Sequence, residues 1–126
     1  MAVVGVGVDA IEIARVERAL ARTPSLVDRL FTEAEQAHCT LRDGRGRAAR
    51  FAGRFAAKEA VAKALGTGVV GFGFRDIEIV SDGEGAPRVV LAAAATVVAS
   101  RMGIARVHVS LSLTTTVAVA SAVAES

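Results

Sequence analysis

The stretch RFAAKEAVAKALG, residues 54–66, decides the fold, because its alanine content predicts a long helix in the middle of the chain. We expect this helix to run from about Arg47 to Leu65, with Gly66 available for a left-handed cap. The stretch holds a single carboxylate, Glu59, among three basic side chains. Glu59 is therefore either half of a surface ion pair or a group placed for chemistry.

Helical geometry divides the side chains of the predicted helix between two sides. At about 100° per residue, one basic stripe is predicted, formed by Arg47, Arg50, Arg54 and Lys58. Such a stripe is ordinarily a solvated face, although beside a glycine loop it also suits phosphates. Glu59 and Lys63 lie across the apolar stripe of Phe51, Phe55 and Ala62, and by themselves they indicate most simply a surface pair one turn apart.

Composition limits the classes of protein to consider. The chain has 126 residues, of which 52% are hydrophobic, with five Phe and neither Trp nor Tyr. This is the size of one domain, so we expect a single domain over residues 1–126. A nucleic-acid module is disfavoured because stacking aromatics are scarce. The net charge of +2 is spread unevenly, and local basic patches suggest an anionic ligand or an acidic partner.

The cysteine content and the start of the chain bear on location. A lone cysteine, Cys39, excludes an intrachain disulfide and fits a reducing compartment. No basic segment precedes the apolar start, which Asp9 and Glu12 interrupt. We therefore expect a cytosolic protein without a membrane anchor. A nucleophilic Cys39 assisted by His38 is disfavoured, because adjacent helical residues point about 100° apart.

The order of elements predicts an α+β fold. Periodicity and turn signals give the order β-α-α-α-β-β-α-β-β, with a small, mainly antiparallel sheet wrapped on the central helix. Thr32 and Glu35 form a capping box that predicts a helix start. Residues 42–46 are expected to be a loop, and residues 75–82 a strand paired with 88–91. The last strand, residues 116–125, has small apolar side chains on both faces, which suggests burial in an oligomer.

Asp9 interrupts a run of valine and glycine near the end of the first strand. A carboxylate in such a place is exposed, hydrogen-bonded or bound to a cation. A cap for a helix beginning near Ala14 is the simpler alternative.

Five segments occur in an order that resembles one known family. They are GVGVDAIEIARVE (5–17), FTEAE (31–35), RFAGRFAAKEAVAKALGTG (50–68), FRDIEIVSDGEGAPRV (74–89) and HVSLSLTTTVAVASAVAE (108–125). Together they resemble the holo-acyl-carrier-protein synthases, the short bacterial 4′-phosphopantetheinyl transferases. The resemblance implies transfer of phosphopantetheine from coenzyme A to a serine of an apo carrier protein, with release of adenosine 3′,5′-bisphosphate. It also implies a homotrimer with active sites at subunit boundaries.

The resemblance further implies roles for single residues. Asp9 and Glu59 look like Mg²⁺ ligands, an assignment that suits the preference of this ion for carboxylate oxygens. Lys63 is assigned to phosphate neutralisation, while the group that takes the serine proton stays open. Further positions are implied for coenzyme A at Arg45, Arg47, Arg50, Arg54, Gly66, Thr67, Gly68, Gly85 and Pro87, and for the acidic carrier protein at Arg15, Arg18 and Arg22.

One position departs from the family pattern. Leu113 stands where many relatives have a polar residue, often histidine. This departure favours the alternative of a catalytically weak relative that binds acidic carrier domains without modifying them, whereas Asp9, Glu59 and Lys63 oppose it. His108 is expected to be structural.

Overall fold

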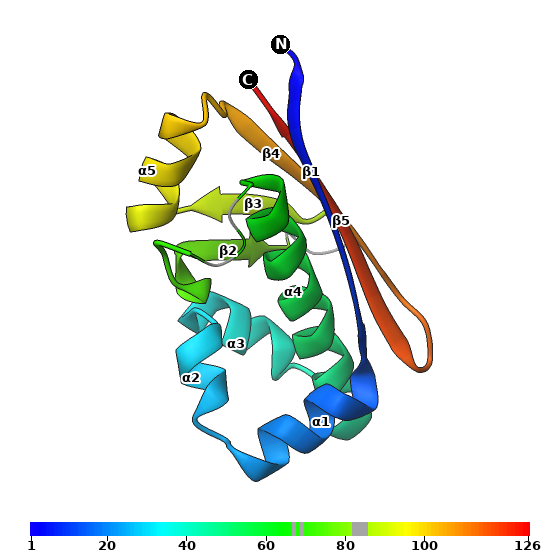
Figure 1. Ribbon diagram of the computed structural model, residues 1–126. Coiled ribbons are helices and arrows are strands. Elements are labelled where there is room, and N and C mark those ends of the chain that lie inside the picture. The colour runs from blue at the N-terminus through cyan, green and yellow to red at the C-terminus, as the bar shows by residue number, and fades with distance from the viewer. Residues whose placement is uncertain (67, 69, 82–85) are drawn as a thin grey trace.

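A long central helix carries two antiparallel sheets on different sides (Figure 1). The computed structural model describes residues 1–66, 68, 70–81 and 86–126. A three-stranded sheet of order β1-β5-β4 lies along one side of the helix, and a two-stranded sheet, β2-β3, lies on the other. The predicted α+β class and the antiparallel pairing are confirmed, although the strands form two sheets rather than one.

The helices and strands have the following bounds. The strands are β1 (Val3–Glu12), β2 (Ile77–Val80), β3 (Arg88–Leu91), β4 (Arg106–Leu113) and β5 (Val117–Glu125). The helices are α1 (Ile13–Arg22), α2 (Leu26–Leu30), α3 (Glu33–Cys39), α4 (Gly44–Ala64) and α5 (Ala93–Arg101), with a 3₁₀ helix η1 (Phe74–Asp76). The two termini lie side by side, where the Ser126 amide donates to the Ala2 carbonyl at 2.9 Å.

β1 lies directly against α4, because glycine occupies two of its inward positions. A Cβ atom on Gly7 would lie 1.9 Å from the carbonyl oxygen of Ala60, and one on Gly5 would lie 2.0 Å from that of Ala64. No side chain fits at such distances. Alanines line the same contact from α4 and β5, and those buried there are Ala56, Ala57, Ala60, Ala64, Ala118, Ala120, Ala122 and Ala124.

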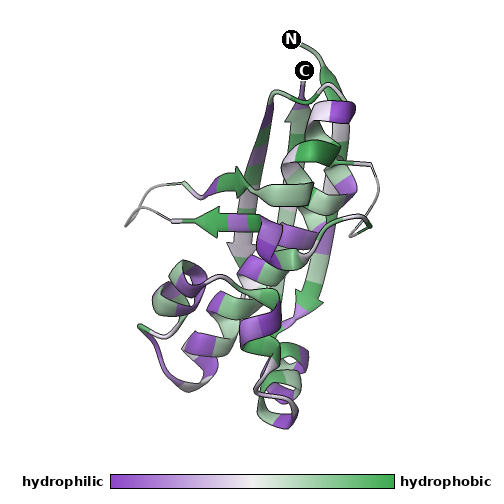
Figure 2. Cartoon of the chain, turned by 90° about the vertical axis from the view of Figure 1, so that its left-hand side faces the viewer, coloured by the Kyte–Doolittle hydropathy of each residue, from purple (hydrophilic) through white to green (hydrophobic). Residues whose placement is uncertain are grey.

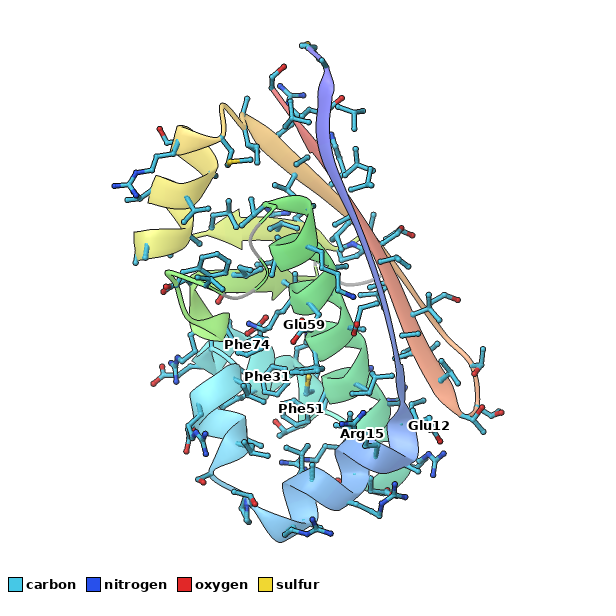
Figure 3. The ribbon with its side chains drawn as sticks, in the orientation of Figure 1. Glu12, Arg15, Phe31, Phe51, Glu59 and Phe74 are labelled. Atoms are coloured by element: carbon cyan, nitrogen blue, oxygen red, sulfur yellow. The ribbon has the colours of Figure 1, made fainter. Side chains whose placement is uncertain are left out.

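The opposite side of α4 packs against α3 and β2 through larger side chains. Phe31 and Phe51 meet with ring centroids 4.7 Å apart (Figure 3). The capping box of α3 is confirmed, since the Thr32 amide donates to Glu35 Oε1 at 2.8 Å and the Glu35 amide donates to Thr32 Oγ1. Gly66 has φ of +87°, as expected for a left-handed cap after α4.

The predicted basic stripe on α4 is wrong as a solvated face. Lys58 is completely buried and Arg54 is 4% exposed. Lys58 Nζ lies 2.7 Å from Glu35 Oε1 and also donates to the carbonyls of Phe74 and Ile77. Helical periodicity alone places Lys58 at the surface. It lies in the core because Glu35 of α3 supplies the opposite charge there.

Three other features of the secondary structure differ from the sequence prediction. α4 begins at Gly44 rather than Arg47, and its first turn is held by Arg45, which donates to the Thr115 carbonyl at 3.2 Å. The short helix α2 was not predicted. Residues 74–76 form a 3₁₀ turn, so the strand expected over 75–82 is confined to Ile77–Val80.

The outer face of the three-stranded sheet is apolar and uncovered in the single chain. Val6 is 68% exposed, Val8 61% and Val119 37%. Figure 2 shows strands that are mostly pale or green, beside helices whose turns alternate between purple and green. Among the described residues, no helix combines the length and the apolar character needed to cross a membrane.

We predict that Gly7→Ala destabilises the protein by about 3 kcal/mol or more, because the new methyl group overlaps the backbone of α4. Urea unfolding at a fixed protein concentration measures this change. Gly73→Ala is the matched control, since Gly73 has an ordinary φ of −102° and no atom lies within 4 Å of the place that its new methyl group would take. The control should shift stability by less than about 0.5 kcal/mol. Equal midpoints for the two variants would contradict the close contact.

Candidate active site

The contact between β1 and α4 brings together three predicted site residues. Lys63 Nζ donates to the Val8 carbonyl at 2.8 Å and lies 3.4 Å from Asp9 Oδ1. Glu59 lies one helical turn before Lys63, in the last third of α4 (Figure 3). Lys63 thus bonds to β1. It does not form the simple surface pair with Glu59 that the spacing of the two residues predicts. Asp9 does not cap α1, whose N-cap residue is Glu12 without a side-chain cap bond.

The electrostatics show that the two carboxylates act on one another. Partial burial raises the pKa of Glu59, the charge of Asp9 raises it further, and Lys63 opposes the shift. Two carboxylates in mutual repulsion gain most from a shared cation. A proton and a metal ion therefore compete for the same oxygens at Glu59.

The donor set fits Mg²⁺ bound partly by substrate. Mg²⁺ prefers oxygen ligands and usually keeps water and substrate phosphates beside one or two carboxylates. Within the described ranges, no group of three or more His, Cys, Asp or Glu side chains is placed to hold a metal by itself. Asp9 and Glu59 thus suit an ion that also needs oxygens from a bound diphosphate.

A second cluster, the Arg54 pocket, lies on another side of α4. It is a hollow of about 240 Å³ lined by His38, Arg50, Gly53, Arg54, Ser81, Pro87, Leu111 and Leu113. Arg54 Nη2 donates to Ser81 Oγ at 3.0 Å, whereas its buried Nε has no hydrogen-bond partner in the described part of the chain. A buried guanidinium with a free N–H is a fitting partner for an anion.

His38 shares this positively charged environment. Burial lowers the pKa of His38, and the charges of Arg54 and Arg50 lower it further. The imidazole is therefore neutral at pH 7. Sequence reasoning assigned neither Ser81 nor His38 to this pocket, because no local pattern brings them to Arg54; Ser81 lies 27 positions away along the chain.

The remaining predicted coenzyme A residues are distributed as follows. Arg45 and Arg47 do not line the Arg54 pocket: Arg45 lies 3.8 Å from Glu17 Oε1, and the Arg47 guanidinium covers the Phe51 ring at 4.8 Å. Gly66 and Gly68 both have positive φ after α4. Thr67 and Gly85 lie outside the described residues, and Pro87 lines the Arg54 pocket.

The predicted carrier-docking residues share one exposed helix. Arg15, Arg18 and Arg22 project from α1, while Ile13, Val16 and Leu20 are buried beneath them. Arg15 also borders a small apolar pocket that Phe55 lines from α4. The side chain of Arg15 is labelled at the start of α1 in Figure 3.

Comparison with known proteins places this arrangement in a family. Residues 5–118 match the model of the 4′-phosphopantetheinyl transferase superfamily. The chain is 47% identical to a holo-[acyl-carrier-protein] synthase of Salinispora arenicola, over 98% of both proteins. It is also 47% identical to the enzyme of that name from Moorella thermoacetica, over 95% of this chain and 92% of the relative.

The chain belongs to the holo-acyl-carrier-protein synthase family of 4′-phosphopantetheinyl transferases. A solved structure supports the same assignment. The holo-(acyl-carrier-protein) synthase of Bacillus anthracis, in complex with CoA (3′,5′-ADP), superposes with a TM-score of 0.82 and 36% identity, covering 98% of this chain and 97% of that one. The family resemblance and the transferase class predicted from the sequence are confirmed.

We predict that Cys39 does not react with a thiol reagent in the folded protein. Burial raises the pKa of Cys39 to about 11, so the thiol is protonated and shielded at pH 8. Ellman's reagent should modify it only after unfolding in denaturant. Rapid reaction of the native protein would show that Cys39 is an accessible thiolate and would reopen its interpretation as a nucleophile.

Proposed function

We propose that this chain transfers 4′-phosphopantetheine from coenzyme A to a serine of an apo acyl carrier protein. The transfer depends on Mg²⁺ and releases adenosine 3′,5′-bisphosphate. The observation that carries the proposal is the meeting of Asp9, Glu59 and Lys63 at the contact between β1 and α4. The relatives named above as holo-[acyl-carrier-protein] synthases, and the coenzyme A complex of the Bacillus anthracis protein, support it.

The chain's own groups divide the work of phosphoryl transfer. Asp9 and Glu59 would hold Mg²⁺, which would supply positive charge to the diphosphate. Lys63 Nζ, already donating to two oxygens of β1, places a second positive charge beside the same position. The Arg54 pocket receives phosphate at the adenosine end, where the unpaired Nε gains a partner.

Glu59→Ala should abolish Mg²⁺-dependent transfer while leaving the fold intact, since Glu59 is only partly buried and its removal leaves no fully buried charge unpaired. The assay incubates the protein with coenzyme A, Mg²⁺ and an apo carrier protein, and follows the carrier by mass spectrometry. We expect activity below about 1% of wild type, comparable with wild type after EDTA treatment. Glu33→Ala, an exposed carboxylate on α3, is the matched control and should retain activity.

Unchanged transfer by Glu59→Ala would contradict the ligand assignment. Absence of a mass gain with wild-type protein and several carriers would instead favour a weak relative that binds carriers without modifying them. Leu113 is the feature that favours this alternative, because it presents an apolar side chain to the Arg54 pocket.

The active site is expected to be complete only between two subunits. Arg54 and Glu59 are five residues apart on α4, so they point about 140° away from one another. One chain therefore does not turn both toward the same ligand. The exposed valines on the outer face of the three-stranded sheet provide a surface for association. We propose a homotrimer in which Asp9 and Glu59 of one subunit meet the Arg54 pocket of the next.

Subunit complementation tests this arrangement. Arg54→Ala and Glu59→Ala should each be inactive, yet a mixture unfolded and refolded together should recover activity. Random pairing in equal amounts makes about a quarter of the shared sites intact, because each site takes one element from each neighbour. No recovery in a mixture that light scattering shows to be oligomeric would place both groups of residues in one chain's site.

The cationic face of α1 is proposed to dock the carrier protein. Acyl carrier proteins are acidic, and complementary charge increases the rate of encounter more than the final affinity. Replacing Arg15, Arg18 and Arg22 by glutamine should raise KM for the carrier at least tenfold and weaken its dependence on salt. KM for coenzyme A should stay the same. An unchanged carrier KM would remove α1 from the docking surface.

A further inference from the structure

The Arg54 pocket gathers positive charge that its described lining residues do not neutralise. Arg50 and Arg54 line it from α4, and no acidic residue is among the described residues around it. Burial lowers the pKa of Arg54, and the charge of Arg50 adds to this shift, against an opposing effect of Glu35. Glu35 already serves another cation, since its Oε1 lies 2.7 Å from Lys58 Nζ.

Both guanidinium groups are held in place by bonds to their surroundings. Arg54 Nη2 donates to Ser81 Oγ at 3.0 Å, and Arg50 Nη1 donates to the His38 carbonyl at 2.8 Å. Arg54 is only 4% exposed, and its Nε has no partner among the described residues. A buried donor without an acceptor costs free energy, which a bound acceptor restores. The pocket therefore suits an anion with several oxygens.

His38 is the group of this pocket that titrates near neutral pH. It lies in the last turn of α3, partly buried, and its residue lines the pocket together with both arginines. Burial lowers the pKa of His38, and the charges of Arg54 and Arg50 lower it further. An anion bound beside these two guanidinium groups offsets their charge. The pKa of His38 then rises, because the imidazolium gains a negative neighbour.

The other described groups around His38 do not take up a proton in this range. On its own helix, Glu35 is bonded to Lys58, and burial raises the pKa of Cys39 to about 11, so that its thiol stays neutral. The arginines of α4 keep their charge at every pH of interest. The remaining described lining residues, from α4, the ends of β2 and β3, and β4, are uncharged: Gly53, Ser81, Pro87, Leu111 and Leu113.

We propose that the Arg54 pocket binds a divalent oxyanion together with one proton, which His38 takes up from solvent as the anion enters. His38 is thus a further binding residue of this pocket. The inference rests on the proposed function for its natural ligand, a phosphate group of coenzyme A, whereas the link between anion and proton follows from the charges that line the pocket.

The linkage sets the direction of the pH dependence. The pKa of His38 is higher in the bound state than in the free state, so the extra affinity is fully present below the free-state pKa. It is lost as the pH rises through the bound-state pKa. Affinity for a divalent anion should therefore increase from pH 8 to pH 5.5.

Sulfate is the probe, because it carries two negative charges throughout this range and does not itself titrate. Proton NMR follows the imidazole signals at constant ionic strength, set with sodium chloride. The chain has two histidines, so His108 is an internal control; it is exposed on β4, where its Nε2 lies 2.7 Å from Glu125 Oε2. Sulfate should raise the pKa of His38 and leave the titration of His108 unchanged.

Two variants assign the effect to one side chain. Wild type and His108→Gln should both bind sulfate at least about fivefold more tightly at pH 5.5 than at pH 8. His38→Gln should match wild type at pH 8 and bind with an affinity that changes less than about twofold between the two pH values. A purely structural role for His38 would weaken binding equally at both. Circular dichroism verifies folding, and if His38→Gln does not fold, the titration of the wild-type protein decides alone.

The outcomes separate this inference from the proposed function. A pKa of His38 that sulfate leaves unchanged, or an affinity for sulfate that is the same at both pH values, would overturn the link between anion and proton. Wild-type protein without transferase activity would instead refute the proposed function. The sulfate titration keeps its meaning in that case, because it uses neither coenzyme A nor a carrier protein.

Discussion

The contact of β1 with the backbone of α4, made possible by Gly5 and Gly7, sets the geometry of the candidate site. Two residues of a strand advance about 6.6 Å, and four residues of a helix advance about 6 Å. Gly5 meets Ala64 and Gly7 meets Ala60, so the strand and the helix keep step along this contact. Asp9 is the next inward position of β1 and is carried toward the turn of α4 that bears Glu59. The glycines thus place Asp9 near Glu59, a position that no local sequence pattern predicts.

The other side of α4 buries two cations, Arg54 and Lys58, among its larger apolar side chains. Burial lowers the pKa of Lys58, and Glu35 opposes this shift by supplying a counter-charge. Arg54 is buried one turn earlier with only part of its guanidinium bonded. One helix therefore presents Glu59 and Lys63 toward β1, and its buried cations, Arg54 and Lys58, on the side of α3 and β2. In the proposed homotrimer, this separation would let a single helix serve the metal end of one site and the phosphate end of the next.

Much of the fold was predictable because its signals are local. The capping box at Thr32, the left-handed Gly66 and the alternating strands each act over a few residues, and the structure confirms them. The start of α4 was not predictable, since Gly44 joins the helix through contacts that Arg45 makes with distant residues. The burial of Lys58 was missed because helical periodicity treats every lysine as a surface residue until its partner, 23 positions away, is known.

The candidate site shows the same division. From residues alone, Asp9 and Glu59 each had a simpler explanation, and only the family resemblance joined them. The structure then supplied what the sequence lacks, the glycine contact that brings β1 against α4 and the bond from Lys63 to β1. The Arg54 pocket depends on Ser81 and Pro87, which follow and precede strands that no local pattern places beside α4.

The most direct test of the central claim is to locate the metal. Crystals grown with coenzyme A and Mn²⁺ in place of Mg²⁺ should give one strong anomalous peak in each active site, within coordination distance of carboxylate oxygens from both Asp9 and Glu59. A peak bound by only one of these residues, or placed away from the contact of β1 with α4, would contradict the account.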